Sequence, residues 1–297
     1  MDKIIECVPN FSEGRRPEVV EAIVDEIRQT PGAILLDYPS DADHNRTVVT
    51  FVGGPEAVAE AAFRACKKAS ELINMEEHRG AHPRMGATDV IPFIPIAGTD
   101  MKECADIAHR VAKRIAEELG IPTYLYEQAA QRPDRVNLAD VRRGEYEGLR
   151  ELISTPERQP DYGPARMHPT AGATAVGARM PLVAYNINLG TSDMSIGKKI
   201  AKAVRGSSGG LVFVKAMAVE LKERQQVQIS MNLVNYIDTP IHRAFELVKL
   251  EAERYGVPVV GSEIVGLVPM NALIGVARHY LRLEEFKSNQ VLETRIR

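Results

Sequence analysis

The order of predicted strands and helices occurs twice along this chain of 297 residues, and this repeat limits the possible folds more than any other feature. In the first half, hydrophobic periodicity predicts strands and helices in the order βαββαβ, at residues 3–8, 17–29, 33–37, 47–52, 55–73 and 90–96. The second half repeats this order at residues 182–189, 195–204, 211–221, 226–236, 240–255 and 258–260. The same order defines ferredoxin-like folds. We therefore predict an α/β (α+β) protein of two ferredoxin-like subdomains, with mixed or antiparallel sheets and a ligand cleft between them.

A segment of different composition, residues 128–180, separates the two repeats. It is rich in arginine, proline and glycine, and it follows a predicted helix at 101–119 and a strand at 122–126. A structureless stretch of this length is unusual in a compact protein unless it has a function. We therefore expect a connector that wraps a ligand, with an N-terminal subdomain at 1–180 and a C-terminal subdomain at 181–297.

The overall charge and the apolar content narrow the class of protein. The formal net charge is −3 and the pI is about 6.2, so there is no basic field to hold a nucleic-acid backbone. No apolar run approaches the roughly 20 residues of a membrane-spanning helix, and the N-terminus lacks a signal-peptide pattern. Three cysteines without metal-ligand spacing are typical of a reducing compartment. We expect a cytoplasmic protein that binds neither nucleic acid nor membrane.

The densest group of reactive side chains lies at residues 78–95, where it leads into a predicted apolar strand. Its glycines and Pro83 oppose a regular helix, so a bent loop is predicted. His82 on such a loop can meet solvent and ligand together, which favours proton transfer by an imidazole with a pKa near neutrality. His78 is as well explained by contacts with the backbone. The two histidines lack the helix and the glutamate of a zinc motif, so we expect no metal.

Polar side chains also follow the first predicted strand and connect the second strand to the third. Asn10 and Ser12 fit a turn that begins a helix, and they also fit donors that bind an anionic substrate together with helix-end amides. Asp41 and Asp43 belong to an acidic loop, which is either solvated surface or a source of a carboxylate that orients a histidine. Both interpretations stay open for each group.

Two further segments have the composition of a ligand site. Residues 163–179 are rich in glycine, alanine and threonine, so their backbone can approach a flat ligand, although they contain neither a Walker A nor a dinucleotide-binding motif. A flexible linker is the alternative. Asn186 and Asn188 alternate on one face of a predicted strand, where polar side chains either satisfy a neighbour or face a ligand.

Sequence blocks along nearly the whole chain closely resemble the glutamate formiminotransferase family. The blocks are CVPNFSEG (7–14), LLD (35–37), NRTVVTFVG (45–53), HRGAHPRMGATDVIPFIP (78–95), IPTYLYEQAA (121–130), GATAVGAR (172–179), AYNINL (184–189) and VPVVGSEIVGLVP (257–269). In animals this activity is one part of a larger formiminotransferase-cyclodeaminase. We expect this chain to be a stand-alone transferase without a cyclodeaminase domain.

The resemblance implies transfer of the formimino group from N-formimino-L-glutamate to N5 of tetrahydrofolate in histidine degradation, by a homodimer with tetrahydrofolate as co-substrate. It assigns catalysis to His82, in the motif HPRMG. It assigns folate binding to a stretch of small and polar residues, namely Gly163, Pro164, Ala165, Arg166, Met167, His168, Pro169, Thr170, Ala171 and Gly172. One departure is Pro39, where animal-type members carry an acidic residue, so Asp41 or Asp43 has to replace that acid.

The chemistry of this transfer predicts roles for the remaining polar residues. A carboxylate of Asp41, Asp43 or Asp89 is the candidate partner of His82, because it would stabilise cationic character at the transferred carbon. Arginines favour bidentate clamping of carboxylates. The substrate-binding candidates are Asn10, Ser12, Asn45, Arg46, Arg84, Arg179, Asn186 and Asn188. The alternatives are a formyl or formiminoglycine donor, and a non-catalytic module that binds folate or an amino acid.

Overall fold

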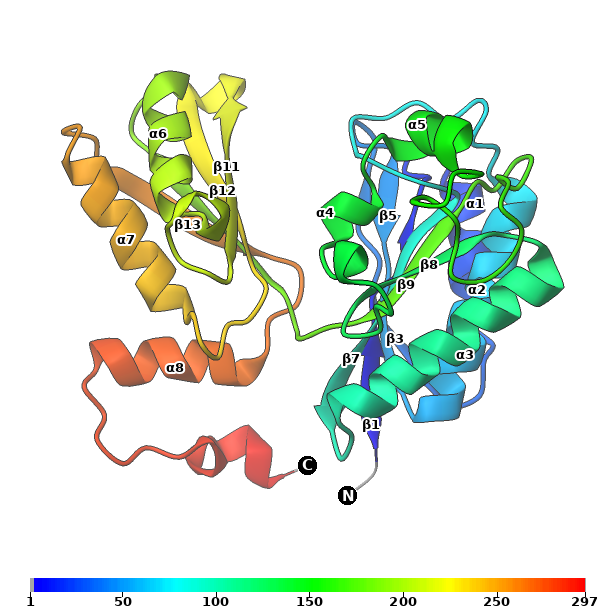
Figure 1. Cartoon of the computed structure of the whole chain (residues 1–297). Helices are drawn as coiled ribbons and strands as arrows, with labels where there is room; N and C mark the ends of the chain where they lie inside the picture. Colours follow the sequence, from blue (N-terminus) through cyan, green and yellow to red (C-terminus); the bar gives the residue numbers. More distant parts are fainter. Residues whose placement is uncertain (1–2, 297) are drawn as a thin grey trace. The chain divides into compact units, whose positions relative to one another are not determined.

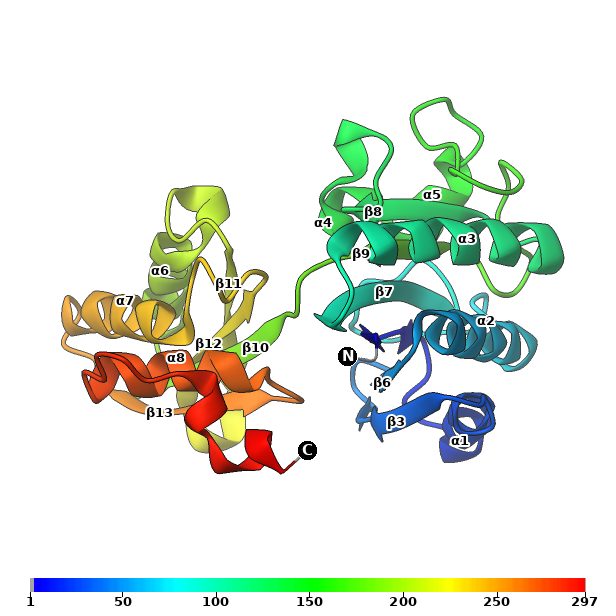
Figure 2. The same cartoon turned by 90° about the horizontal axis from the view of Figure 1, so that it is seen from below.

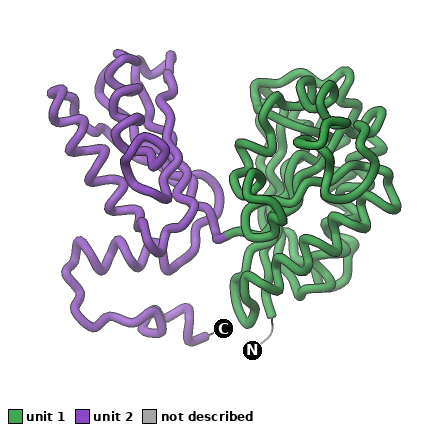
Figure 3. The backbone as a smooth tube through the Cα atoms, in the orientation of Figure 1, with its two compact units in different colours: residues 1–179 green, residues 180–297 purple. Residues whose placement is uncertain are grey.

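The computed structural model describes residues 3–296 and divides into two compact units, Met1–Arg179 and Met180–Arg297 (Figure 3). Each unit has its own sheet and its own hydrophobic core. No helix in the described part of the chain is both long enough and apolar enough to cross a membrane.

Unit 1 contains the predicted βαββαβ motif. Its elements are β1 (Ile4–Cys7), α1 (Pro17–Arg28), β3 (Ala33–Asp37), β6 (Thr50–Gly53), α2 (Pro55–Leu72) and β7 (Thr88–Ala97). The strands lie in the order β3-β6-β1-β7, and neighbouring strands are antiparallel, which is the ferredoxin-like arrangement. The predicted fold of the first half is therefore confirmed.

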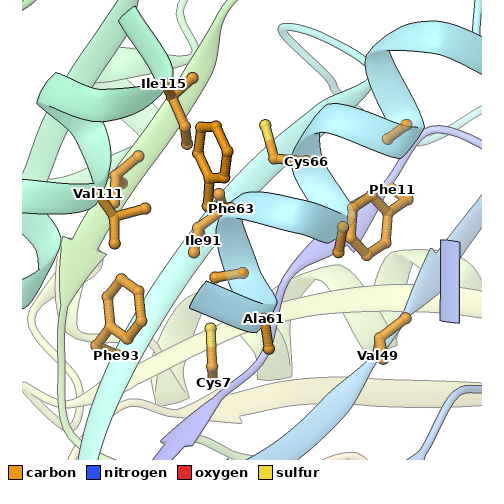
Figure 4. Packing of buried hydrophobic residues seen from close by; sticks show 14 of the residues in the cluster. Cys7, Phe11, Val49, Ala61, Phe63, Cys66, Ile91, Phe93, Val111 and Ile115 are labelled. Carbon is orange, nitrogen blue, oxygen red and sulfur yellow. The ribbon is translucent and has the colours of Figure 1, made fainter. Parts of the chain in front are cut away.

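Amphipathic helices cover one face of this sheet (Figure 2). Helices α1 and α2 begin at Pro17 and Pro55, whose fixed φ suits a first helical turn. Helix α3 (Met101–Leu119) begins after Asp100, whose side chain caps it, and it ends at Gly120, with φ +67°. The apolar stripes of these helices pack against the sheet and form the main core, part of which Figure 4 shows.

The predicted connector at residues 128–180 folds into unit 1, but it is not a structureless stretch. It contains η1 (Pro133–Arg135), α4 (Leu138–Val141), α5 (Glu145–Leu152) and β9 (Thr174–Ala178). Strand β9 pairs in parallel with β7 on one side and with β8 (Thr123–Glu127) on the other, so the sheet is mixed. Every residue of β9 is buried, so its small side chains show no alternation that would predict a strand.

Short strands extend the sheet near the start of β7. Strand β2 (Asn10–Phe11) pairs with β7, β5 (Arg46–Val48) pairs with β2, and β4 (Ser40–Asp41) pairs with β5. The predicted strand at 47–52 is thus divided between β5 and β6. As a result, the acidic loop at 41–45 lies at the same end of the sheet as the start of β7.

Unit 2 repeats the motif, as predicted. Its elements are β10 (Val183–Leu189), α6 (Met194–Val204), β11 (Val214–Leu221), β12 (Gln226–Leu233), α7 (Ile241–Glu253) and β13 (Val259–Val265). The strands are antiparallel in the order β11-β12-β10-β13, with α6 and α7 against one face (Figure 1). Helix α8 (Met270–Tyr280), which the periodicity did not predict, packs against α7. Short 3-10 turns lie at η2 (Gly206–Ser208), η3 (Lys222–Arg224), η4 (Ser288–Gln290) and η5 (Leu292–Arg295).

Candidate active site

The loop that carries His82 joins α2 to β7 in unit 1 and is held against the acidic loop. The backbone N–H of Ala81 donates to the carbonyl oxygen of Asp43 at 3.2 Å. A Cβ atom on Gly80 would lie 2.3 Å from the carbonyl oxygen of His44, so the two backbones approach more closely than a side chain allows. These contacts fix residues 80 and 81 and so position the imidazole that follows.

Two buried polar side chains hold the end of the same loop. The hydroxyl of Ser12 donates to the carbonyl oxygen of Gly86 at 2.7 Å, and the carboxylate of Asp89 accepts from the backbone N–H of Met85 at 2.9 Å. Ser12 is 3% exposed and Asp89 is 1% exposed. The hydroxyl proton of Ser12, a predicted substrate donor, is therefore used to position the loop.

The imidazole of His82 is half-buried in a positive environment. Burial and the nearby charges of Arg46 and Arg142 lower the pKa of His82 to about 3. The expected pKa near neutrality is therefore wrong for the ligand-free protein. At pH 7 the imidazole is neutral, so it begins any reaction as a proton acceptor.

The other histidine of the loop has a structural role. Nδ1 of His78 accepts from Nε of Arg84 at 3.3 Å, so its Nε2 carries the proton and donates to the carbonyl oxygen of Asn45 at 3.0 Å. The guanidinium of Arg84 also forms ion pairs with Glu147 at 2.7 Å and with Glu145 at 3.2 Å. Arg84, a predicted substrate clamp, is thus bound by carboxylates of α5.

The three candidate carboxylates contact groups other than His82. Asp89 forms an ion pair with Arg142. Asp41 binds Nδ1 of His44 at 2.9 Å, and Asp43 contacts the loop through its backbone carbonyl. Within residues 3–296, no carboxylate forms a hydrogen bond or ion pair with His82. The acidic loop therefore anchors the histidine loop through its backbone.

Two arginines, one of them not predicted, give the site its positive charge. Arg46 lies on β5, and Arg142 follows α4 in the segment that was predicted as a connector. The Nε–H groups of both are buried without a hydrogen-bond partner among the described residues. Arg142 carries no sequence signal because it is one of many arginines in this segment, and its contact with Asp89 spans 53 residues.

The predicted folate-binding stretch, residues 163–172, packs directly against the histidine loop. The backbone N–H of Ala87 donates to the carbonyl oxygen of Ala171 at 2.8 Å, and Gly86 and Gly172 form a β-bridge. A Cβ atom on Gly172 would lie 2.5 Å from the carbonyl oxygen of Met85, and its φ is +73°. The structure thus brings together two segments that are some 80 residues apart in sequence.

The same stretch is ordered by its own histidine. Nδ1 of His168 accepts from the backbone N–H of Ala171 at 3.0 Å, and its backbone exchanges hydrogen bonds with Gly172 at 3.1 and 3.2 Å. Burial lowers the pKa of His168. The stretch begins at Gly163, whose φ is +93°. It is a shaped turn and not a flexible linker.

The turn after β1 does not present free helix-end amides to a ligand. Glu13 is 3% exposed, and its Oε1 accepts from the backbone N–H groups of Gly14, Arg15 and Arg16 at 3.0, 2.8 and 3.0 Å. Burial alone would raise the pKa of Glu13, but these N–H groups and the Arg16 guanidinium lower it. An internal carboxylate thus takes the place of the anionic substrate that the sequence predicted there.

Two asparagines near this turn also bind the backbone. Nδ2 of Asn10 donates to the carbonyl oxygen of Val8 at 3.1 Å. Asn45 accepts from the backbone N–H of Gly14 at 2.9 Å and donates to the carbonyl oxygen of Arg79 at 3.0 Å. Asn45 also has a positive φ of +48°, which asparagine tolerates better than most residues. Both side chains therefore help to shape the site.

The remaining predicted substrate residues lie outside this cluster. Arg179 follows β9, where its charge acts on Glu6 and on the buried Tyr126. Asn186 and Asn188 lie on β10 of unit 2. Nδ2 of Asn186 donates to Glu263 at 3.1 Å, and Oδ1 of Asn188 accepts from Gln228 at 2.9 Å. These polar side chains belong to a hydrogen-bonded ladder on the sheet face opposite the helices.

No group of three or more histidine, cysteine, aspartate or glutamate side chains is placed to hold a metal ion among residues 3–296. The fold and the site define a two-unit ferredoxin-like α/β protein. Its unit 1 carries a neutral histidine near two arginines, on a loop that contacts the turn at residues 163–172.

Comparison with known proteins assigns the family. Residues 4–179 match the N-terminal subdomain of the formiminotransferase domain, and residues 184–296 match the formiminotransferase domain. The glutamate formimidoyltransferase of Streptococcus pyogenes serotype M1 is 52% identical and covers 100% of this chain and 99% of its own length. That of Thermoplasma acidophilum is 53% identical, with 99% and 97% covered. The formimidoyltransferase-cyclodeaminase of Mus musculus is 46% identical over 96% of this chain and 54% of its own length. The chain therefore belongs to the formiminotransferase family.

Proposed function

We propose that this protein transfers the formimino group of N-formimino-L-glutamate to N5 of tetrahydrofolate, giving L-glutamate and 5-formiminotetrahydrofolate in histidine degradation. The observation that carries the proposal is the contact between the histidine loop and the turn at residues 163–172. Full-length similarity to two glutamate formimidoyltransferases supports it. Tetrahydrofolate is then the co-substrate, and residues 163–172 hold it beside His82.

The proposed reaction uses His82 as the proton carrier. N5 of tetrahydrofolate attacks the formimino carbon, which forms the new C–N bond and a tetrahedral intermediate. The neutral imidazole of His82 takes the proton that N5 must lose. It then delivers this proton to the glutamate nitrogen, which leaves with the electron pair of the broken C–N bond. General acid–base catalysis of this kind contributes about 10²–10⁴-fold to the rate.

The structure of the loop explains why this proton transfer is assigned to one of two histidines. Both ring nitrogens of His78 bind neighbouring protein groups. The ring of His82 is half-buried and has no carboxylate partner among the described residues, so its nitrogens are available for substrate. Holding both substrates in one orientation supplies the remaining acceleration.

We also propose that the protein is a cytoplasmic homodimer. Cys7, Cys66 and Cys104 are all free and buried, which is consistent with a reducing compartment. Ile34 and Leu36 of β3 are 61% and 47% exposed on one face of the strand, which favours a contact with another surface. Sedimentation equilibrium tests the dimer, and a monomer at micromolar concentration contradicts it.

Mixing the protein with N-formimino-L-glutamate and tetrahydrofolate tests the proposed activity directly. The expected product is 5-formiminotetrahydrofolate, detected by mass spectrometry together with free glutamate. The matched controls are formiminoglycine and N-formylglutamate as donors. Faster transfer from either of these would change the donor, and tight folate binding without transfer from any donor would indicate a binding module.

A further inference from the structure

Arg46 and Arg142 form an unusual pair, because both are partly buried and they lie close enough for the charge of Arg142 to lower the pKa of Arg46. Burying a cation is unfavourable unless hydrogen bonds and opposite charges compensate it. Asp89 compensates Arg142 in part, through one nitrogen of its guanidinium. The Nε–H of each arginine lacks a partner within residues 3–296.

We propose that Arg46 and Arg142 form an anion site beside His82 that binds the α-carboxylate of the donor glutamate. This inference rests on the proposed function, because it assigns a protein site to one group of the donor. It concerns residues of unit 1 alone. The clamp predicted at Arg84 is thereby replaced, because Arg84 is already paired with two carboxylates of α5.

The chemistry of the donor selects its α-carboxylate over its γ-carboxylate. In N-formimino-L-glutamate, the nitrogen that leaves is bonded to the same carbon as the α-carboxylate. A carboxylate that occupies the site beside His82 therefore places the leaving nitrogen near the imidazole. A carboxylate has two acceptor oxygens and a negative charge, so it can accept from two guanidinium groups. A carboxamide has one acceptor oxygen and no charge, so it cannot replace the carboxylate there.

Binding at this site also changes the charge of His82. The charged and titratable groups that face the imidazole are Arg46, Arg142, His44 and His78, and all of them oppose its protonation. A bound carboxylate cancels much of this positive potential and favours the imidazolium form. His82 is thus a weak base in the free protein, and it becomes a stronger base that can hold a proton once the donor is bound.

Unreactive donor analogues test the site without any turnover. The probes are N-acetyl-L-glutamate, N-acetyl-L-glutamine, which keeps only the α-carboxylate, and N-acetyl-L-isoglutamine, which keeps only the γ-carboxylate. Their affinities come from calorimetry, and the pKa of His82 comes from NMR titration of histidine-labelled protein, with the signal assigned through His82→Gln. We expect the first two probes to bind and to raise the pKa of His82 by about one to three units. The isoglutamine analogue should bind about 10- to 100-fold more weakly and leave the pKa unchanged.

Matched variants of adjacent arginines add a second test. Arg142→Met and Arg46→Met should weaken binding of N-acetyl-L-glutamine about 10- to 100-fold. Arg143→Met should bind normally, because Arg143 is exposed and pairs with Asp140 at the surface. The probe comparison uses the unaltered protein, so it decides the question even if a variant fails to fold.

Equal binding of the glutamine and isoglutamine analogues, or an unchanged pKa of His82 with the α-carboxylate bound, would overturn the proposed site. Failure of the proposed function has a different signature. A protein that transfers no formimino group but binds these analogues as expected retains the anion site and loses the assigned reaction. An active transferase in which Arg142→Met binds the glutamine analogue normally retains the reaction and loses the site.

Discussion

At the scale of single residues, the two histidines of one loop differ because of what their ring nitrogens contact. Both nitrogens of His78 are bound, and burial lowers its pKa, so this ring stays neutral and holds Arg84 and the backbone of Asn45 in place. No carboxylate of the described chain forms a hydrogen bond or ion pair with His82, and the charges of Arg46 and Arg142 lower its pKa. These contacts support the proposal that His82 transfers the proton, whereas His78 shapes the loop.

Replacing His82 by alanine should lower kcat about 10²–10⁴-fold with little change in tetrahydrofolate affinity. The reason is that the change removes the proton carrier and leaves the turn at 163–172 intact. Steady-state kinetics and folate binding by fluorescence measure the two effects, and added imidazole should restore part of the rate. Near-normal turnover in this variant would remove His82 from the proton-transfer role.

The low pKa of His82 predicts the pH dependence of the free enzyme. Since protonation of His82 occurs only near pH 3, the base form is present throughout the range of about pH 5–7. The profile of kcat/KM for the donor should therefore show no acid limb near the ordinary histidine pKa of about 6.5. The profile of kcat, which reports the complex, should show its acid limb at higher pH than kcat/KM does. A kcat/KM that falls tenfold between pH 7 and pH 5.5, and does so less steeply in His82→Gln, contradicts this.

Sequence reasoning succeeds at the residue scale where the local chain dictates the outcome. The glycines and Pro83 exclude a helix at residues 78–86, and the structure has a loop there. It fails for Arg142, because the place of this side chain in the site depends on its ion pair with Asp89 in a distant segment. It also fails for Glu13, whose capture of three backbone N–H groups cannot be distinguished in sequence from an exposed acid.

At the scale of elements, the contact between two glycines joins the histidine loop to the proposed folate turn. A Cβ atom on Gly86 would lie 2.3 Å from the carbonyl oxygen of Ala173 and 2.5 Å from that of Ala171. Backbone atoms on both sides cannot move without separating the two segments. The proposed site therefore requires glycine at position 86, where a side chain would keep the two backbones apart.

Gly86→Ala should destabilise the protein by roughly 1–3 kcal/mol and weaken folate binding, because it forces these two backbones apart. Gly148→Ala is the matched control, since a Cβ atom there meets open space inside α5. This control should be stabilised by about 0.5–1 kcal/mol, because alanine favours a helix more than glycine does. Urea unfolding measures both changes, and equal stability of the two variants would show that the loop and the turn can separate freely.

Elements with clear periodicity are the ones that sequence predicts. Helices α1, α2 and α3 have buried stripes at helical spacing, and β12 alternates between core and the opposite face, so their limits agree closely with the prediction. Strand β9 lies in the interior of a mixed sheet, where both faces are buried, and its sequence TAVGA has no alternation of polar and apolar positions to mark an exposed face. For this reason the sequence did not predict a strand at residues 174–178.

At the scale of the whole molecule, the chain is built from two units whose cores share no residue. The core residues of unit 1 end at Ala178, and those of unit 2 begin at Val183. The two ferredoxin-like sheets have the same strand order, yet only unit 1 extends its sheet with β9 and β8. This extension is what places the turn at 163–172 against the histidine loop, so the proposed chemistry is concentrated in the larger unit.

A fragment of residues 1–179 should therefore fold by itself and unfold in one cooperative transition, because it retains every residue of its core. The matched control is residues 1–165, which lacks β9 and so leaves β7 and β8 without the strand that pairs with both. We expect this shorter fragment to show no cooperative transition, since unpaired backbone groups would be left in the middle of the sheet. Circular dichroism during urea titration distinguishes the two, together with amide dispersion in NMR spectra. If residues 1–165 unfold as cooperatively as residues 1–179, then β9 is an addition to an already stable sheet and not a part of its core.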